Sequence, residues 1–195
     1  KWQAALGGEL KLMVSGSAAL QTRLTRVFAA ANMPIMEGYG LTETSPVTSV
    51  NDVRNGGFRP GTVGKVISGV EVKIAETGEI LIKGPNVMMG YYKDPEKSAE
   101  VLKDGYFHSG DKGEIDADGF LKITGRTKEM FKTSGGKYVI PPLLEGQLKQ
   151  SLFIEQVMVV GENEKMPAAL IQPNFEFIRD WIERKGHKIG TSCKE

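Results

Sequence analysis

Apolar and polar residues change their spacing twice along this chain, and each spacing predicts a different kind of structure. The apolar run at residues 10–14 predicts a buried strand, and residues 15–17 predict the turn after it. The next apolar positions fall on one face of a helix: Leu20, Leu24, Val27, Phe28 and Ala31. Another apolar run, at residues 34–37, predicts a second buried strand. Together they predict an α/β unit, in which ligands bind at the carboxyl ends of the strands.

From residue 56 to residue 124 the pattern changes to short strands and turns. Apolar and charged residues alternate at residues 70–74, as they do in a half-buried strand. Asp118-Gly119 is typical of a hairpin turn between two such strands. Asp94 and Pro95 predict the start of a helix that interrupts them. We expect a small antiparallel β-barrel or sandwich in this part of the chain.

The last part of the chain mixes helix and strand patterns. Pro141 and Pro142 predict the start of a helix that runs to about Ser151, residues 156–160 predict a strand, and Asn174 caps a further helix. The expected fold class is therefore mixed α/β. Its expected parts are an α/β unit (residues 1–55), a small antiparallel β-barrel subdomain (56–124) and an α+β module (129–195).

Charge and composition narrow the classes of function. The 25 basic and 24 acidic residues nearly balance, so net charge favours neither nucleic acid nor an anionic membrane as a partner. A single cysteine, Cys193, rules out an internal disulfide framework, and His108 and His187 form no metal-binding pattern. No apolar run reaches the roughly 20 residues that span a bilayer. The start at Lys1, with no initiator Met and no signal-peptide pattern, predicts a piece of a longer polypeptide, and a reducing cytoplasm is the default expectation for it.

The stretch Gly38-Tyr-Gly-Leu-Thr-Glu-Thr-Ser-Pro46 holds the most informative chemistry of the chain. Its two glycines let the backbone turn sharply and approach a ligand closely. Tyr39 offers an aromatic face for a base, Thr42 a hydroxyl for a phosphate oxygen, and Glu43 a hard oxygen ligand for Mg²⁺. A Gly-x-Gly pair alone is more typical of a plain polar turn, so the inference rests on the whole stretch.

The whole stretch resembles a loop of the adenylate-forming enzymes, the family that includes the acyl-CoA synthetases. The resemblance implies an adenine contact at Tyr39, a phosphate contact at Thr42 and the Mg²⁺ carboxylate at Glu43. Thr42 and Glu43 would then be the catalytic residues, with Gly38 and Gly40 lining the nucleotide.

Residues 15–20 resemble the family's glycine-rich turn beside adenine. The resemblance implies nucleotide contacts at Gly16, Ser17 and Ala18, although ordinary turn chemistry explains these residues equally well. Family members often have a second glycine and a proline where this chain has Ser17 and Ala19.

Asp111 and Arg126 are the next informative pair. Asp111 lies between glycines at the mouth of a predicted hairpin, where it is either a turn residue or a carboxylate that accepts the two hydroxyls of a ribose. Its segment, residues 104–114, is similar to the signature of fatty acyl-CoA synthetases, with Ser109 in place of the usual threonine. This similarity implies that Asp111 binds the ribose of ATP. It also implies ribose and phosphate contacts at Arg126, which is a plain surface charge without the resemblance.

Residues 125–128 match the family's hinge, with Lys128 at the position about which a C-terminal lid domain rotates. The loop that follows, residues 132–138, is not a phosphate-binding P-loop, because Phe131 occupies the position of the required glycine. In acyl-CoA synthetases this loop lines the path of the pantetheine arm of coenzyme A. Its sequence here resembles that of the long-chain acyl-CoA synthetases. The residues implied on the CoA side are Ser134, Gly135 and Gly136.

The resemblance implies part of a long-chain fatty acid–CoA ligase, which uses ATP and Mg²⁺ to form an acyl-adenylate and then transfers the acyl group to coenzyme A. Its partners would be these small molecules and the fatty acid, with no nucleic acid and at most peripheral contact with the inner face of a membrane. The alternatives are a ligase for an aryl or medium-chain acid, or a chain that is only a non-catalytic nucleotide-binding module.

The resemblance places the family's phosphate loop before Lys1 and its catalytic lysine after Glu195. It therefore implies that residues 1–55 are the end of an α/β domain and that residues 129–195 are an incomplete α+β lid domain. We therefore expect the isolated chain to fold without being active. We also expect it to self-associate through an exposed sheet edge.

Overall fold

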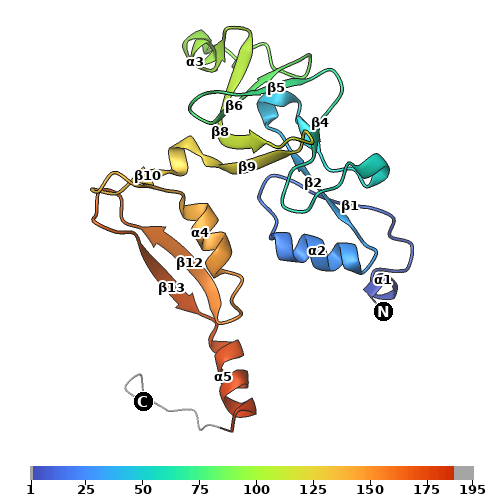
Figure 1. Cartoon of the computed structure of the whole chain (residues 1–195), viewed down its shortest axis with the longest axis vertical. Helices are drawn as coiled ribbons and strands as arrows, with labels where there is room; N and C mark the ends of the chain where they lie inside the picture. Colours follow the sequence, from blue (N-terminus) through green and yellow to red (C-terminus); the bar gives the residue numbers. More distant parts are fainter. Residues whose placement is uncertain (1, 187–195) are drawn as a thin grey trace. The chain divides into compact units, whose positions relative to one another are not determined.

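The computed structural model describes residues 2–186 of the 195-residue chain (Figure 1). The chain divides into two compact units, residues 1–127 and residues 128–195. Cys193, the single cysteine, and His187, one of the two histidines, lie outside the described residues. Within the described part, no helix is long and apolar enough to cross a membrane.

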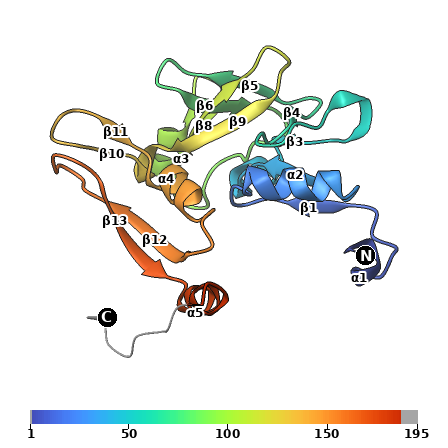
Figure 2. The ribbon, with the colours of Figure 1, turned by 60° about the horizontal axis from the view of Figure 1, so that its bottom comes forward.

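The first unit opens with a strand, a helix and a parallel strand. The elements are α1 (Trp2–Ala5), β1 (Met13–Ser15), α2 (Thr22–Ala30) and β2 (Ile35–Tyr39). β1 and β2 pair in parallel, and the sheet continues antiparallel through β3 (Ser49–Val50) to β4 (Lys65–Val66). Figure 2 shows α2 lying along this sheet. The strand–helix–strand unit expected from the sequence is present.

β1 is less buried than its apolar pattern predicts. The strand begins at Met13 rather than at residue 10, and Leu10, Leu12 and Val14 are exposed, Val14 by 65%. Among the described residues only β2 pairs with β1, so β1 is an edge strand. The prediction of a buried strand is wrong, because no further strand or layer of the described residues covers the apolar run.

The second sheet of the first unit has a long strand at its centre. Its members are β5 (Glu71–Ile74), β6 (Glu79–Lys83), β7 (Leu102–Lys103), β8 (Tyr106–Ile115) and β9 (Leu121–Arg126). β8 pairs with β6 along one edge, and with β7 and then β9 along the other. Helix α3 (Pro95–Val101) lies before β7 and begins as predicted, because the Asp94 side chain accepts a 3.0 Å hydrogen bond from Lys97 N. The core of this sheet consists of Ile80, Ile82, Phe107 and Leu121.

The second sheet stays open, so the closed barrel expected from the sequence is not formed by the described strands. β5 pairs only with β6, and β9 does not return to it. The free edge of β9 is used differently: Val63 N donates to the Leu121 carbonyl (2.9 Å), and Leu121 N donates to the Gly64 carbonyl (2.8 Å). The chain before β4 thus occupies the edge that barrel closure would need.

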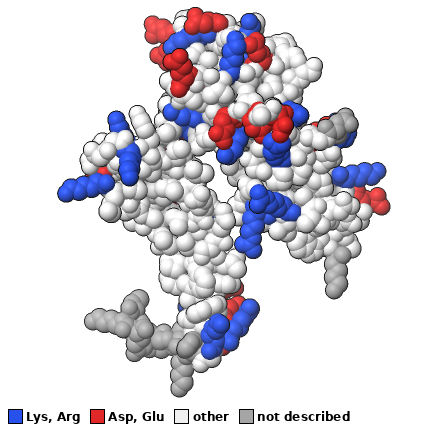
Figure 3. All heavy atoms as spheres, viewed as in Figure 1, with Lys and Arg blue, Asp and Glu red and all other residues white. Residues whose placement is uncertain are grey.

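Charged side chains of both signs lie side by side over the first unit on the face drawn in Figure 3. The exposed ion pairs of the first unit include Lys122 with Glu114 (2.8 Å). Arg59 lies over the Phe120 ring and pairs with Asp116 and Asp118 of the β8–β9 turn. Exposed pairs of this kind contribute little to stability, because solvent and salt screen the two charges.

The described part of the second unit, residues 128–186, contains two hairpins and two helices. Its elements are β10 (Phe131–Lys132), β11 (Tyr138–Val139), α4 (Pro141–Leu148), β12 (Ile154–Val160), β13 (Ala168–Pro173) and α5 (Phe175–Arg184). β10 pairs with β11 and β12 with β13, both antiparallel. α4 packs on β12 and begins at Pro141 as predicted, but it ends at Leu148 rather than near Ser151.

The end of the second unit is held by an aromatic cluster and a helix cap. The Phe153 ring packs edge-on against Phe177 and Trp181, with centroids 5.1 Å and 5.6 Å away. Asn174 accepts a 3.0 Å hydrogen bond from Phe177 N, which confirms the predicted cap of α5. The helix therefore begins where the sequence pattern placed it.

Candidate active site

The turn after β2 requires a glycine at position 40. A Cβ built on Gly40 would lie only 1.6 Å from the Pro46 carbonyl oxygen. A Cβ on Gly38 would meet the Ser49 carbonyl oxygen at 3.4 Å, which is close to ordinary contact. The close approach at Gly40 is thus to the chain itself. Gly40 lets residues 40–46 fold back tightly on the end of β2.

Thr44 holds this turn together from inside. It ends a 3-10 turn, Thr42–Thr44, and its side chain is fully buried. Its hydroxyl accepts hydrogen bonds from Leu41 N (2.9 Å) and from the Thr48 hydroxyl (3.2 Å). With Thr44 buried, the two preceding side chains face outward: Thr42 is exposed and Glu43 is partly exposed.

Glu43 has a partner that the sequence analysis missed. The Tyr91 hydroxyl donates a 2.8 Å hydrogen bond to Glu43 Oε1. Burial of Tyr91, followed by this hydrogen bond to a carboxylate, raises the pKa of the phenol. The two residues are 48 positions apart and no local pattern links them, so only the fold brings them together.

Tyr39, Asp111 and Arg126 form a second hydrogen-bonded group. Asp111 in β8 lies directly opposite Arg126 in β9. Arg126 Nε donates to Asp111 Oδ1 at 2.9 Å, and the Tyr39 hydroxyl donates to Asp111 Oδ2 at 2.7 Å. Burial, and then the negative charge of Asp111, raise the pKa of Tyr39. Three residues singled out from separate motifs therefore meet at one carboxylate.

The position of Asp111 depends on Ser109. The Ser109 hydroxyl donates to the Ile80 carbonyl (2.7 Å) and accepts from Asp111 N (3.1 Å). The Asp111 side chain is only 4% exposed, whereas the Arg126 side chain is 57% exposed. A serine hydroxyl and a threonine hydroxyl can both make these two hydrogen bonds. Ser109 therefore supports Asp111 as the family's usual threonine could.

The turn after β1 lies beside the Tyr39 strand. Ser15 is opposite Glu37 in the parallel pair, so the carboxyl ends of both strands meet at one edge of the sheet. A Cβ on Gly16 would lie 3.7 Å from the Gly38 carbonyl oxygen, which places the two glycines next to each other. Ser17 has a left-handed backbone (φ 67°), and it and Ala18 are exposed.

The remaining predicted residues belong to the second unit. Ser134, Gly135 and Gly136 form the exposed tip between β10 and β11. Thr133 N and the Lys137 carbonyl close this loop with a 2.9 Å hydrogen bond. Lys128 lies in a 3-10 turn at Thr127–Glu129, where the second unit begins.

Comparisons with known proteins identify the family. A family profile described as "AMP-binding enzyme" matches residues 1–92. The long-chain-fatty-acid–CoA ligase FadD15 of Mycobacterium bovis is 41% identical over 192 residues, which cover 98% of this chain and 32% of that protein. This chain belongs to the AMP-binding, adenylate-forming family. Its Gly38–Pro46 turn falls within the matched profile, and the FadD15 alignment spans nearly the whole chain.

Other members of the AMP-binding family act on different acids. The indoleacetate–CoA ligase of Aromatoleum aromaticum is 37% identical over 171 residues, which cover 83% of this chain and 33% of that protein. A crystal structure of the anthranilate CoA ligase AuaEII with anthranoyl-AMP superposes with a TM-score of 0.73 at 28% identity, over 94% of this chain and 39% of that one. The chain spans about a third of the length of the curated relatives it matches.

Proposed function

We propose that the chain is part of a long-chain fatty acid–CoA ligase. The enzyme would use MgATP to convert a fatty acid to an acyl-adenylate, and coenzyme A would then displace AMP. The observation that carries this proposal is the group formed by Tyr39, Asp111 and Arg126 next to the Thr42–Glu43 turn. The 41% identity to a long-chain-fatty-acid–CoA ligase supports the same proposal.

The nucleotide would bind at the end of β2. In this proposal Tyr39 contacts adenine, Asp111 and Arg126 contact the ribose, and Thr42 contacts a phosphate. Both Asp111 oxygens already accept hydrogen bonds from the protein. Each carboxylate oxygen has a second lone pair, so ribose hydroxyls can share Asp111 with Tyr39 and Arg126. Gly16, Ser17 and Ala18, together with Gly38 and Gly40, would line the same edge of the sheet.

The residues present fit a magnesium ion that arrives with ATP. Within residues 2–186 no three acidic, histidine or cysteine side chains come close enough together to hold a metal by themselves. Mg²⁺ usually binds through one or two carboxylates together with substrate phosphates and water, and the partly exposed Glu43 supplies such a carboxylate. The bound cation would neutralise charge on the reacting phosphates. The backbone that carries Glu43 is continued by Thr44, whose side chain is fully buried.

The second half-reaction would use the second unit. In this proposal Ser134, Gly135 and Gly136 line the path of coenzyme A, and Lys128 is the hinge of a lid domain. The division of the chain at residue 128 supports a hinge there, because hinges lie at element ends between compact units. The three-part organisation, with an α/β domain end, a β-rich subdomain and a lid, belongs to the same proposal.

The setting of the enzyme is part of the proposal as well. We place it in the cytoplasm, with at most peripheral contact with a membrane. The apolar β1 edge, with Val14 exposed, favours self-association of the isolated chain.

The choice of acid is tested by a substrate panel. The full-length enzyme is assayed for acid-dependent ATP–pyrophosphate exchange with long-chain, medium-chain and aryl acids. The proposal expects the highest kcat/KM with long-chain fatty acids. Preference for an aryl acid would contradict the proposal and favour an aryl acid–CoA ligase. The 37% identity to an indoleacetate–CoA ligase supports this alternative.

A third candidate is a non-catalytic nucleotide-binding module. Calorimetric titration of the 195-residue chain with AMP and ATP separates it from the ligase proposal. The ligase proposal expects weak binding at most, because part of the phosphate-binding machinery would lie outside the chain. Tight binding of either nucleotide by the isolated chain would favour the module.

A further inference from the structure

The segment between β6 and α3 is tied to the Thr42–Thr44 turn at three points. The Asn86 side-chain amide donates to the carbonyls of Thr44 and Val47, both at 3.0 Å. Met88 N donates to the Glu43 carbonyl at 2.8 Å. The Tyr91 hydroxyl donates to the Glu43 carboxylate. The three hydrogen bonds from Asn86 and Met88 go to backbone carbonyls of residues 43–47, and the one from Tyr91 acts on the side chain of Glu43.

Tyr91 is itself fixed in place. Its backbone N donates to the Ser98 hydroxyl at 2.8 Å, and the Ser98 hydroxyl donates to the Asp94 carbonyl at 2.7 Å, which ties Tyr91 to the start of α3. The Lys97 ammonium lies 4.6 Å from the centre of the Tyr91 ring. The phenol hydroxyl therefore reaches Glu43 from an anchored ring.

The hydrogen bond makes the two oxygens of Glu43 unequal. Oε1 accepts from Tyr91, and no donor among the described residues contacts Oε2. A carboxylate held by one oxygen loses rotational freedom, and its other oxygen keeps a defined direction. Carboxylates that bind metals are commonly held in this way by a hydrogen bond from a neighbouring side chain.

We propose that Tyr91 is a positioning residue, whose hydroxyl orients Glu43 so that Oε2 faces a divalent cation bound to the phosphates of ATP. The inference rests on the metal role of Glu43 proposed above. Tyr91 does not touch the cation or the nucleotide, and it acts through Glu43 alone.

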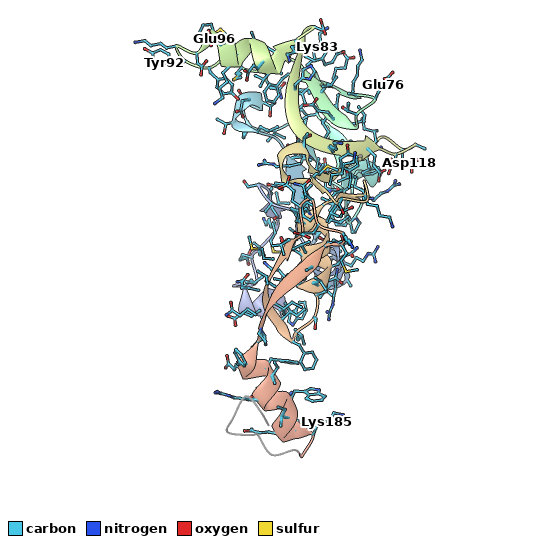
Figure 4. The ribbon with its side chains drawn as sticks, turned by 90° about the vertical axis from the view of Figure 1, so that its left-hand side faces the viewer. Glu76, Lys83, Tyr92, Glu96, Asp118 and Lys185 are labelled. Atoms are coloured by element: carbon cyan, nitrogen blue, oxygen red, sulfur yellow. The ribbon has the colours of Figure 1, made fainter. Side chains whose placement is uncertain are left out.

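The chain offers a matched control in the neighbouring tyrosine. Tyr92 is 88% exposed, and Figure 4 shows it pointing away from the sheets beside α3. Tyr91→Phe removes one oxygen atom and keeps the ring under Lys97. Tyr92→Phe removes the same atom from a side chain that has no contact with Glu43.

The test measures binding by calorimetry in the full-length enzyme, without any acid substrate. ATP affinity is measured with Mg²⁺ and with a chelator, and their ratio gives the metal-dependent gain in affinity. Tyr91→Phe should lower this gain about tenfold, the lower end of the effect of outer-shell partners on metal affinity. Tyr92→Phe should leave the gain unchanged. Glu43→Gln should abolish it, and adding Tyr91→Phe to Glu43→Gln should change nothing further.

The outcomes separate the inference from the proposal beneath it. If Glu43→Gln loses the gain and Tyr91→Phe keeps it, the role of Tyr91 is wrong and the metal role of Glu43 stands. If Glu43→Gln keeps the gain, the metal role itself is wrong. AMP affinity without metal should be the same in all variants. A Tyr91→Phe enzyme that loses AMP affinity equally, or no longer melts cooperatively, would assign the hydroxyl to folding and overturn the inference.

Discussion

The turn at residues 38–46 and the loop at residues 132–138 contain similar ingredients, glycines and hydroxyl side chains, but the structure uses them differently. In the turn, Thr44 is fully buried, and Gly40 leaves no room for a Cβ beside Pro46. In the loop, a Cβ on Gly135 would have nothing within 4 Å, and Ser134 is exposed.

The difference also lies in which residues hold each segment. The 38–46 turn is held by residues far away in sequence, at Asn86, Met88 and Tyr91. The 132–138 loop is closed by its own Thr133, and two further bonds reach it from residues 163–164: Ser134 N donates to the Glu164 carbonyl, and Asn163 N donates to the Lys132 carbonyl. The turn is therefore tightly packed against the rest of its unit, whereas the tip of the loop at residues 134–136 is exposed and has room for a larger side chain at position 135. Substitutions should affect the two segments in different ways.

The largest effect is expected at the carboxylate of the tightly packed turn. Glu43→Gln in the full-length enzyme should lower acid-dependent ATP–pyrophosphate exchange by about 10²–10³-fold, because a neutral amide is a poor Mg²⁺ ligand. Ser134→Ala, in the exposed loop, is the matched control and should leave exchange unchanged. Exchange by Glu43→Gln within about threefold of the wild-type rate would remove Glu43 from the metal role.

The next largest effect is expected at Lys128, where a substitution should slow thioester formation and spare adenylation. Lys128→Pro should leave exchange largely intact and lower thioester formation from acyl-AMP by about 10²-fold, because proline fixes φ and misplaces the groups of the second unit. Lys128→Ala keeps the backbone free and should leave both steps intact. Equal losses in both steps of the proline variant would make Lys128 a structural residue and not a hinge.

Stability should distinguish the glycines of the two segments. Gly40→Ala forces a Cβ against the Pro46 carbonyl and should destabilise the chain by about 1–3 kcal/mol or more. Gly135→Ala adds a methyl group in open space and should change the unfolding free energy by no more than about 0.5 kcal/mol. Denaturant unfolding of the 195-residue chain measures both. Equal effects would show that the turn relaxes as easily as the loop.

The smallest effect concerns the buried carboxylate that precedes the turn. Glu37 is 6% exposed and accepts a 3.0 Å hydrogen bond from the Thr25 hydroxyl. Burial raises its pKa above the usual 4.5. A raised pKa in the folded state means that stability is highest below the unfolded pKa and falls as pH rises through the folded pKa.

Glu37→Gln removes this titration. Thermal melting from pH 4 to pH 7 should show the wild-type chain losing stability relative to the variant as pH rises. A constant difference between the two chains across this range would contradict the raised pKa.

Local patterns predicted the local elements of the fold well. The caps at Asp94 and Asn174 lie where expected, and the Asp118-Gly119 turn joins β8 to β9. Patterns failed where a distant segment decides the outcome. The apolar run at residues 10–14 predicts a buried strand, but burial requires a neighbouring layer, and Leu10, Leu12 and Val14 are exposed. The predicted barrel does not close, because residues 63–64 pair with β9.

The candidate site shows the same division. Tyr39, Asp111 and Arg126 were chosen from separate motifs, and the fold brings them into hydrogen-bond contact, although the roles given to them stay predictions. Tyr91 carries no local signal, because its importance comes only from a contact 48 residues away. Residues that act by holding another residue are hard to find from one sequence, because their chemistry is ordinary and only their position matters.

The most direct test of the account is to trap the intermediate in a single turnover. The full-length enzyme is mixed with ATP, Mg²⁺ and a long-chain fatty acid without coenzyme A, quenched, and analysed by mass spectrometry. The account predicts an acyl-adenylate that stays bound at the site containing Tyr39, Asp111 and Arg126 and becomes an acyl-CoA thioester when coenzyme A is added. An enzyme that forms no long-chain acyl-adenylate, whether or not it forms an adenylate from another acid, would contradict this prediction.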